Sequence, residues 1–326
     1  MFHRVRLLLT VAAVFGLLGA ILCTAKEVVD LAEAQADPDF AIQGEYVGEG
    51  VLLDKSKDKV GAQVIAQGNG AFQVVVYQGG LPGDGWKRGD ERFLMEGKAA
   101  ELKGRELTGK IADGKLTISD ADGKQKLQLS RTERKSPTLG EKPPAGAVVI
   151  FDGSNLDKFL PIEGHLTDDK SLISGATFKP EYNNYHLHLE FRLSWMPEAR
   201  GQGRSNSGVY LHDCYECQVL DSFGLEGHNN ECGGFYQAKE PDVNMCLPPM
   251  AWQTYDIDLT APKFEDGKKV ANARVTIRHN GVLIHDNFEL PGATPGGKPE
   301  GPGPRGIQLQ GHGNKVYYRN MWLQAK

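Results

Sequence analysis

The segment Tyr215–Asp221 combines two carboxylic acids and an amide at a spacing that can support acid–base chemistry. Side chains alternate between the two faces of a strand, so Glu216 and Gln218 share one face. A single bulge after Gln218 would return Asp221 to that face. With paired carboxyl groups, one can act as base or nucleophile while the other protonates a leaving oxygen. We therefore predict Glu216 and Asp221 as catalytic residues, with a buried polar network as the alternative.

The segment 185–192 alternates between apolar and polar residues, as a half-buried strand does. Its apolar residues are predicted to face the core: Tyr185, Leu187, Leu189 and Phe191. Its other face carries His186, His188, Glu190 and Arg192. Two imidazoles and a carboxylate on one face can hold a divalent metal, and Arg192 can orient a substrate. No cofactor is expected. A metal at His186, His188 and Glu190 is kept as an alternative to an ordinary solvated face.

Three further segments contribute candidate residues. His312 lies between two glycines, where its side chain has little steric cover, and we predict it as a third catalytic residue. Asn206 lies within Gly201–Gly208, a Gly-rich lead into a strand, and Tyr236 ends a polar loop. Trp252 opens a strand, where it can stack on a sugar ring or pack in the core. The predicted substrate-binding residues are therefore Arg192, Asn206, Gln218, Tyr236 and Trp252.

Short strand-like runs separated by turn signals fill most of the chain and indicate an all-β protein. Residues 40–131, with a hairpin signal at Asn69-Gly70, predict a small antiparallel β-meander domain without an assigned role. Residues 132–146 are polar and proline-rich, and they predict a linker. Residues 147–326 contain about eight strand-like runs and no convincing amphipathic helix, which favours a two-sheet jelly-roll sandwich.

The composition and the N-terminus restrict the class of protein. The chain has 40 glycines and a formal net charge of −5, so no basic surface invites nucleic acid. Arg4 and Arg6 precede the uncharged run Leu7–Leu22, and Cys23-Thr-Ala25 offers small residues for cleavage. We predict a signal peptide at residues 1–25, cleaved after about Ala25, and export to the periplasm or the extracellular space. A retained membrane anchor is the alternative, and only then would the protein contact a membrane.

Four cysteines follow the predicted signal peptide, at Cys214, Cys217, Cys232 and Cys246. An oxidising compartment permits disulfides, and Cys232–Cys246 is the most plausible pair. A zinc site is less plausible, because a spacing of three on a strand points Cys214 and Cys217 to opposite faces. The remaining alternative is four buried thiols.

The ordered motifs of the C-terminal half resemble those of the 3-keto-disaccharide hydrolase family over about residues 147–326. Val149–Asp157 is similar to the family's opening "LFDGxxLxxW" signature, and further matches follow in chain order. These are Asn206–Tyr210, Tyr215–Gly224, Asn230–Gly233, Trp252–Asp256, His279–Val282 and Arg319–Trp322. The resemblance implies a concanavalin-like jelly roll. It also implies activity as a 3-keto-glucoside 1,2-lyase or as a hydratase of the resulting 2-hydroxy-glucal.

The resemblance makes a glycoside or oligosaccharide the expected substrate. Carried onto this chain, it favours Glu216 and Asp221 as acid–base groups and His312 as the next candidate. Relatives commonly have Asp where this chain has Gly311, so the group expected to orient His312 is missing. The Glu-x-Gln-x-x-Asp pattern also resembles that of laminarinase-type glycosidases, which makes an ordinary retaining glycosidase an alternative. A lectin-like module that binds carbohydrate without catalysis is the alternative from another class.

Overall fold

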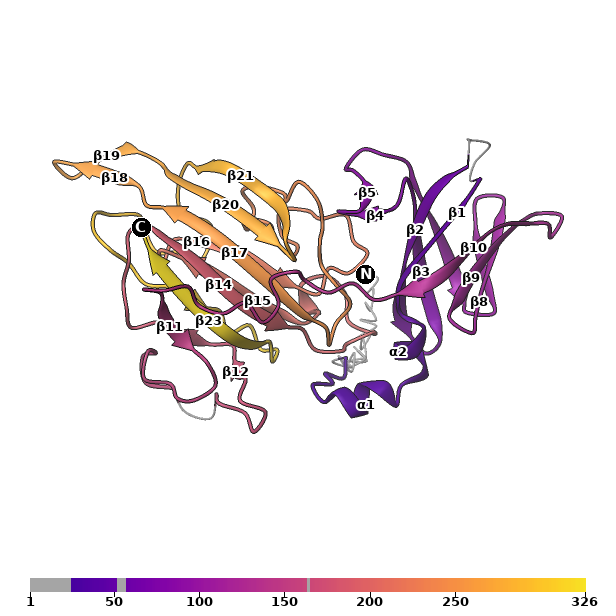
Figure 1. Cartoon of the computed structure of the whole chain (residues 1–326), viewed down its shortest axis with the longest axis horizontal. Helices are drawn as coiled ribbons and strands as arrows, with labels where there is room; N and C mark the ends of the chain where they lie inside the picture. Colours follow the sequence, from indigo (N-terminus) through magenta and orange to yellow (C-terminus); the bar gives the residue numbers. More distant parts are fainter. Residues whose placement is uncertain (1–24, 52–56, 163–164) are drawn as a thin grey trace, which may run out of the picture.

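The structure is a computed structural model and describes residues 25–51, 57–162 and 165–326. Figure 1 shows an N-terminal barrel beside a C-terminal sandwich. Within the described ranges, the helices are α1 (Leu31–Gln35), α2 (Pro38–Ile42) and a single 3-10 turn, Gly201–Gly203, so the all-β prediction is confirmed. None of them is long and apolar enough to cross a membrane. The predicted signal peptide lies, except for Ala25, outside the described residues.

The predicted meander is confirmed, and its two ends meet to close an antiparallel barrel. Its strands follow one another around the barrel, and the last strand pairs with the first through Val47 and Ser130. These strands are β1 (Gly44–Gly50), β2 (Asp58–Gly68), β3 (Ala71–Gln78), β6 (Arg92–Lys98), β7 (Glu101–Gly104), β8 (Leu107–Ala112), β9 (Lys115–Asp120) and β10 (Gln125–Thr132). The connection between β3 and β6 carries a small parallel pair, β4 (Leu81–Pro82) and β5 (Gly85–Trp86).

Local turn chemistry and alternating apolar residues explain why this segment forms a barrel. Asn69 and Gly70 have φ of 55° and 71°, as the two-residue hairpin between β2 and β3 requires. Val60, Ala62 and Val64 point inward from β2 and are fully buried in the barrel core. Closing the barrel removes the free sheet edges that an open meander would expose.

The C-terminal unit is a sandwich of two antiparallel sheets, which confirms the jelly-roll prediction. The larger, seven-stranded sheet has the order β11-β23-β14-β17-β20-β21, with β12 paired to β23. Its strands are β11 (Val148–Phe151), β12 (Leu172–Ile173), β14 (Tyr185–Arg192), β17 (Trp252–Thr260), β20 (Ala273–His279), β21 (Val282–Leu290) and β23 (Tyr317–Ala325). The smaller, four-stranded sheet is β13 (Ala176–Thr177), β22 (Gln308–Leu309), β15 (Asn206–Leu211) and β16 (Tyr215–Leu220). A separate hairpin consists of β18 (Lys263–Glu265) and β19 (Lys268–Ala271).

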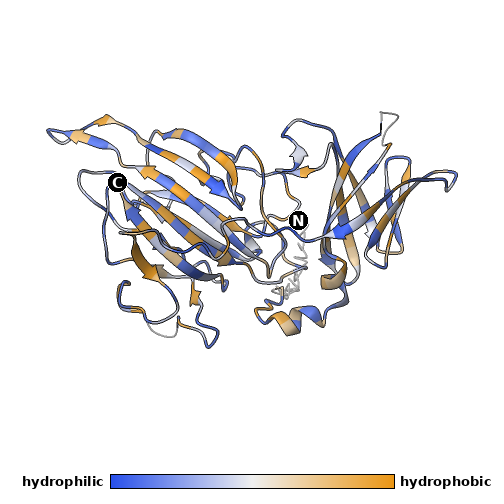
Figure 2. Ribbon diagram, in the orientation of Figure 1, coloured by the Kyte–Doolittle hydropathy of each residue, from blue (hydrophilic) through white to orange (hydrophobic). Residues whose placement is uncertain are grey.

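The sandwich core lies between the inner faces of these two sheets. Figure 2 shows hydrophilic and hydrophobic residues alternating along the strands. On β14, the predicted core residues Tyr185, Leu187, Leu189 and Phe191 are all fully buried. The smaller sheet contributes Val209, Cys217 and Val219 to the same core. The inner and outer faces of β14 are therefore as the alternation predicted.

The linker between the two units packs on the outer face of the larger sheet instead of spanning solvent. It runs from β10 across this sheet to β11 (Figure 1). Ser136 Oγ lies 2.6 Å from Thr254 Oγ1, and Thr138 donates to Asp256 over 2.7 Å. The Gly140 amide donates to Glu190 over 2.6 Å. The polar face that we expected to be solvated or ligand-binding is therefore covered by the chain itself.

The four cysteines are all buried free thiols, so the predicted Cys232–Cys246 disulfide is wrong for this structure. Cys232 Sγ lies 3.2 Å from the Tyr255 hydroxyl, and Cys246 Sγ donates to the Leu220 carbonyl over 3.6 Å. Cys232 and Cys246 thus each have a polar contact inside the sandwich core.

The contacts of His188 with Asp256 and Glu190, which lie beneath the linker, predict that the stability of the fold depends on pH. Burial alone would lower the pKa of His188, but hydrogen bonds with Asp256 and Glu190 raise this pKa from 6.5 to about 9. A group whose pKa is higher in the folded state stabilises the fold below its unfolded pKa, and this stabilisation is lost as pH rises through the folded pKa. We expect the free energy of unfolding to fall between pH 6.5 and 9.

Urea unfolding at pH 6 and pH 9 tests this expectation. His188→Gln should be destabilised at pH 6 and should lose less stability than the wild type on going to pH 9. His186→Gln, on the same strand face, is the control and should keep the wild-type loss. A wild-type loss that persists unchanged in His188→Gln would contradict the assignment.

Candidate functional site

A pocket of about 210 Å³ lies on the smaller sheet of the sandwich, on the face away from the core. Strands β15 and β16 and the loops beside them supply nearly all of its wall. Its lining residues are Gln202, Asn206, Tyr210, Glu216, Gln218, Tyr236, Pro295, Gly296, Gln310 and His312. Five of the predicted site residues are therefore brought together: Asn206, Glu216, Gln218, Tyr236 and His312.

The strand register explains how these side chains meet. In the β15–β16 ladder Gly208 is paired with Gln218, and Tyr210 with Glu216. Even-numbered residues of both strands therefore share the pocket face. Gly208 lies between them without a side chain, and a Cβ there would lie 2.3 Å from Glu216 Oε1. The glycine gives the Glu216 carboxyl the space to lie against the strand.

Glu216 is the chemically distinctive residue of the pocket. Its side chain is buried, its Oε2 accepts a hydrogen bond of 2.9 Å from the Tyr210 hydroxyl, and its backbone amide donates to Thr294. Burial raises the pKa of Glu216 from 4.5 to about 7, although hydrogen bonds from Tyr210 and Gln310 act in the opposite direction. A carboxyl with such a pKa exchanges protons near neutral pH, as a general base or acid must.

The side-chain NH2 groups of Asn206, Gln218 and Gln310 all lie against other residues of the pocket. Asn206 Nδ2 donates to the carbonyl of Gln202 over 3.0 Å, and Gln218 Nε2 donates to Gln202 Oε1 over 3.0 Å. Gln310 Nε2 lies 3.4 Å from the Tyr210 hydroxyl. As a result, Asn206 Oδ1, Gln218 Oε1 and Gln310 Oε1 are buried and have no partner among the described residues. These three free acceptors favour a ligand that donates several hydrogen bonds.

The rim of the pocket supplies the possible donors. Tyr236 is half-buried and His312 is exposed, and neither side chain has a hydrogen bond to another residue in the described ranges. Tyr236 is held in place through its backbone, whose amide donates to the Glu216 carbonyl over 3.1 Å. Both side chains are therefore free to donate to a bound ligand.

The sequence interpretation missed three polar lining residues, Gln202, Tyr210 and Gln310. The alternation that placed Glu216 and Gln218 on one face also applies to β15, where it aligns Tyr210 with Asn206. This signal could have identified Tyr210. Gln202 lies in a 3-10 turn outside any strand, and no periodicity indicates its position.

Asp221 does not reach the pocket, which corrects the prediction that it pairs with Glu216. The β15–β16 ladder runs from Leu211–Tyr215 to Asn206–Leu220 without a register shift, so the expected bulge after Gln218 does not exist. Asp221 is buried, and its Oδ2 forms an ion pair of 3.0 Å with Arg204 Nη2. Its position indicates a structural role at the end of the strand.

Arg192 and Trp252 also lie away from the pocket, because they belong to the outer face of the larger sheet. The guanidinium of Arg192 lies 5.1 Å from the Trp252 ring centre and 4.8 Å from that of Tyr317. The guanidinium of Arg319 also lies over the Trp252 ring, 4.0 Å from its centre. The structure thus places both predicted substrate-binding residues in a cation–π stack on the opposite sheet.

The structure does not bring the three predicted metal ligands, His186, His188 and Glu190, to one point. Side-chain atoms of Glu141, His188 and Asp256 lie within 4.8 Å of one another. His188 Nδ1 lies 2.6 Å from Asp256 Oδ1, and hydrogen bonds with Asp256 and Glu190 raise the pKa of His188 to about 9, so a metal bound there would have to displace a proton. A metal-binding imidazole must be neutral at the ligating nitrogen. His186 is bonded to Asp258 instead, and Glu190 to Arg319.

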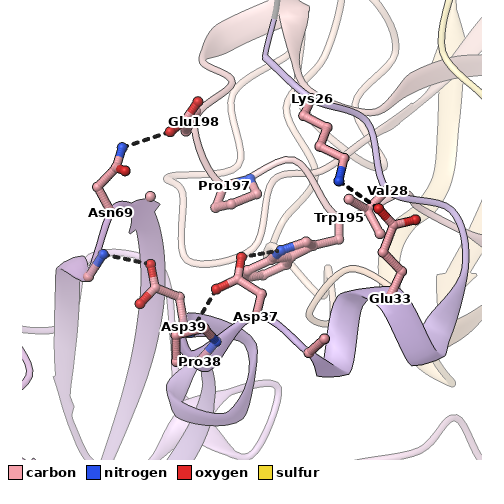
Figure 3. A pocket seen from close by; sticks show the side chains of 13 residues that line it. Lys26, Val28, Glu33, Asp37, Pro38, Asp39, Asn69, Trp195, Pro197 and Glu198 are labelled. Carbon is pink, nitrogen blue, oxygen red and sulfur yellow. Dashed lines mark hydrogen bonds and ion pairs between the residues drawn. The ribbon is translucent and has the colours of Figure 1, made fainter.

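A larger cavity, of about 680 Å³, lies where the barrel meets the sandwich (Figure 3). Its polar side chains are bonded to one another: Trp195 Nε1 donates to Asp37 over 3.0 Å, and Asn69 Nδ2 donates to Glu198 over 2.7 Å. The backbone of Gly70 donates to Asp39 over 2.8 Å. These bonds join the two units, so the smaller pocket is the better candidate for chemistry.

Comparison with known proteins agrees with this geometry. The 3-keto-alpha-glucoside-1,2-lyase-like domain matches residues 146–324. A crystal structure of a provisionally assigned glycosyl hydrolase from Parabacteroides distasonis ATCC 8503 is 27% identical, with a TM-score of 0.51, over 57% of this chain and 86% of that chain. Another such crystal structure from the same organism is 18% identical, with a TM-score of 0.41, over 56% of this chain and 94% of that chain. No curated protein matches.

The fold and the comparisons define a glycosyl-hydrolase-like protein of the carbohydrate-active class. More narrowly, the chain belongs to the family of the 3-keto-alpha-glucoside-1,2-lyase-like domain, as its ordered motifs indicated. The barrel lies outside the matched residues.

The raised pKa of Glu216 predicts that this residue destabilises the folded protein at high pH. Because the folded pKa lies above the unfolded one, stability is full below pH 4.5 and falls as pH rises to about 7. Glu216→Gln should therefore be more stable than the wild type at pH 8, by on the order of 2 kcal/mol. This advantage should vanish near pH 4.5.

Denaturant unfolding at the two pH values measures this difference. Asp221→Asn is the contrasting control, because it breaks a buried ion pair and should destabilise the protein by roughly 3–5 kcal/mol at pH 8. If Glu216→Gln is also less stable than the wild type at pH 8, Glu216 is a structural residue and its pKa is not raised.

Proposed function

We propose that the protein cleaves 3-keto-glycosides by removing the C2 proton and eliminating the substituent at C1. The observation that carries this proposal is the single buried carboxyl of Glu216, with its pKa raised to about 7, in a pocket lined by free hydrogen-bond acceptors. Membership of the 3-keto-alpha-glucoside-1,2-lyase-like family supports the same substrate class.

The single carboxyl favours elimination over ordinary glycoside hydrolysis. Retaining and inverting glycosidases use two carboxyl groups on opposite sides of the glycosidic bond. Among the described lining residues, Glu216 is the one carboxylic acid, because Asp221 is paired with Arg204 elsewhere. Proton removal next to a ketone needs one base, since the ketone itself makes the C2 proton acidic.

The pocket also suits a single sugar ring. Its volume of about 210 Å³ is below the roughly 300–1,000 Å³ of pockets that hold drug-sized ligands. The free oxygens of Asn206, Gln218 and Gln310 can accept hydrogen bonds from sugar hydroxyls. A large aglycone would extend past the rim, where Tyr236 and His312 lie.

The bond changes balance within the substrate and Glu216. The Glu216 carboxylate takes the C2 proton, and the C2–H electrons form the enolate of the C3 ketone; when the C1–O bond breaks, these electrons form the C1=C2 double bond and the ketone is restored. Negative charge develops on the C3 ketone oxygen, and the free donors of Tyr236 and His312 can stabilise it. The leaving oxygen takes a proton from His312 or water, which yields the aglycone and a 2-hydroxy-glucal-type enone. Addition of water at C1 would then give the 3-keto sugar.

The direct test is incubation with a 3-keto-β-glucoside, a 3-keto-α-glucoside and their unoxidised parents, each deuterated at C2. We expect aglycone release from a keto substrate only, with loss of C2 deuterium followed by NMR. Cleavage of a parent sugar would identify an ordinary glycosidase. Saturable binding without turnover would identify a lectin-like module and contradict the enzyme proposal for these substrates.

Acid–base variants test the role of Glu216. Glu216→Gln should lower kcat by roughly 10²–10⁴-fold, the usual contribution of a general base. Since a base must be ionised, kcat/KM of the wild type should rise with pH through about 7. Asp221→Asn, assayed below its unfolding temperature, should keep kcat within a few-fold of the wild type. A collapse of kcat in folded Asp221→Asn would restore the two-carboxylate mechanism.

A further inference from the structure

The two loops that lead into and out of the pocket strands are both held by the barrel. Loop 193–205 precedes β15 and carries Gln202, and loop 221–251 follows β16 and carries Tyr236. The Asn230 carbonyl in loop 221–251 accepts a 2.8 Å hydrogen bond from Gln202 Nε2. The position of the amide cluster in the pocket therefore depends on both loops.

Arg88, in the barrel's β3–β6 connection, holds loop 221–251 at two points. Its Nη2 donates to the Gly227 carbonyl and to the Pro241 carbonyl, each over 2.9 Å. Its Nη1 lies 3.5 Å from Glu240 Oε2. Gly227 and Pro241 lie on either side of the segment that contains Tyr236. One guanidinium therefore binds both ends of this segment.

Apolar and ionic contacts support the same attachment. Phe223 of loop 221–251 is fully buried against Ile65, Tyr77 and Trp86 of the barrel. Gly224 follows at φ 73°, and a Cβ there would lie 2.3 Å from Ile65 Cδ1. Arg92 of β6 forms an ion pair with Glu226 of the same loop.

Loop 193–205 is attached to the barrel in a similar way. Arg200 Nη2 donates to the Gln67 carbonyl at the end of β2, over 2.9 Å. Glu198 accepts from Asn69 in the β2–β3 turn (Figure 3). Trp195 is buried with the apolar residues of the barrel core. Both walls of the pocket thus rest on one side of the barrel.

We propose that the barrel braces the substrate pocket, with Arg88 as the positioning residue that fixes the segment 227–241. The proposal rests on the proposed function for its kinetic consequence. Tyr236 and Asn230 lie in this segment, whereas Glu216 lies on β16, whose position is also fixed by its ladder with β15. Loss of Arg88 should therefore weaken substrate binding and lower kcat only as far as Tyr236 contributes to it, while the pKa of Glu216 stays unchanged.

The test compares Arg88→Met with Arg88→Lys and with Arg274→Met in the full chain. Arg274 is matched because it too makes several hydrogen bonds, to Asn287 and Glu289, but on the far edge of the larger sheet. For Arg88→Met we expect KM for the 3-keto-glycoside to rise roughly three- to tenfold, as the loss of one or two hydrogen bonds implies. The kcat should fall by a smaller factor than the one by which KM rises, and the pH at which kcat/KM rises should stay the same. The KM of Arg88→Lys should lie between those of the wild type and Arg88→Met.

Hydrogen exchange gives a readout that does not depend on the substrate. Amides of residues 227–237, including Gly234 and Gln237, should exchange about tenfold faster in Arg88→Met and unchanged in Arg274→Met. If the wild type shows no lyase activity but this exchange difference is present, the proposed function fails and the brace stands. Equal exchange in Arg88→Met and the wild type would overturn the brace, as would a loss of kcat without a change in KM.

Discussion

Burial of one carboxyl group without a neighbouring cation is the constraint on which the pocket depends. The sequence around Glu216 satisfies this constraint in three ways. Gly208 leaves room for the carboxyl against the strand, and the Tyr210 hydroxyl supplies one hydrogen bond. The amides of Asn206 and Gln218 donate to Gln202 and not to Glu216. A cation at any of these positions would favour the ionised form and remove the near-neutral proton exchange.

The second carboxyl of the Tyr215–Asp221 segment lies in the opposite environment, because it is paired with a cation. Asp221 lies a few residues from Glu216, yet its charge is matched by Arg204 at 3.0 Å and turned away from the pocket. One acid thus stabilises the end of β16, and the other is buried with a raised pKa, at a cost in stability at high pH. Residues placed for function commonly oppose stability in this way.

Local patterns in the sequence predicted much of the fold and part of the site. Alternation along β14 identified Leu187 and Phe191 as core, and alternation along β16 put Glu216 and Gln218 on one face. Asp221 was misplaced because a bulge depends on the neighbouring strand, which the segment itself does not specify. Trp252 was misplaced because alternation does not tell which of two sheets a polar face belongs to. The docking of the linker on Glu190 is a tertiary contact with no local signal.

The three unpartnered amide oxygens determine what kind of recognition the pocket can provide. These oxygens are buried and have no partner among the described residues, so a sugar hydroxyl that reaches one of them satisfies an otherwise unpaired acceptor. A deoxy or O-methylated sugar, however, would leave a buried acceptor of Asn206, Gln218 or Gln310 unsatisfied. Each such loss costs about 1–3 kcal/mol. The pocket is therefore suited to rejecting sugars that lack the hydroxyl groups which these acceptors require.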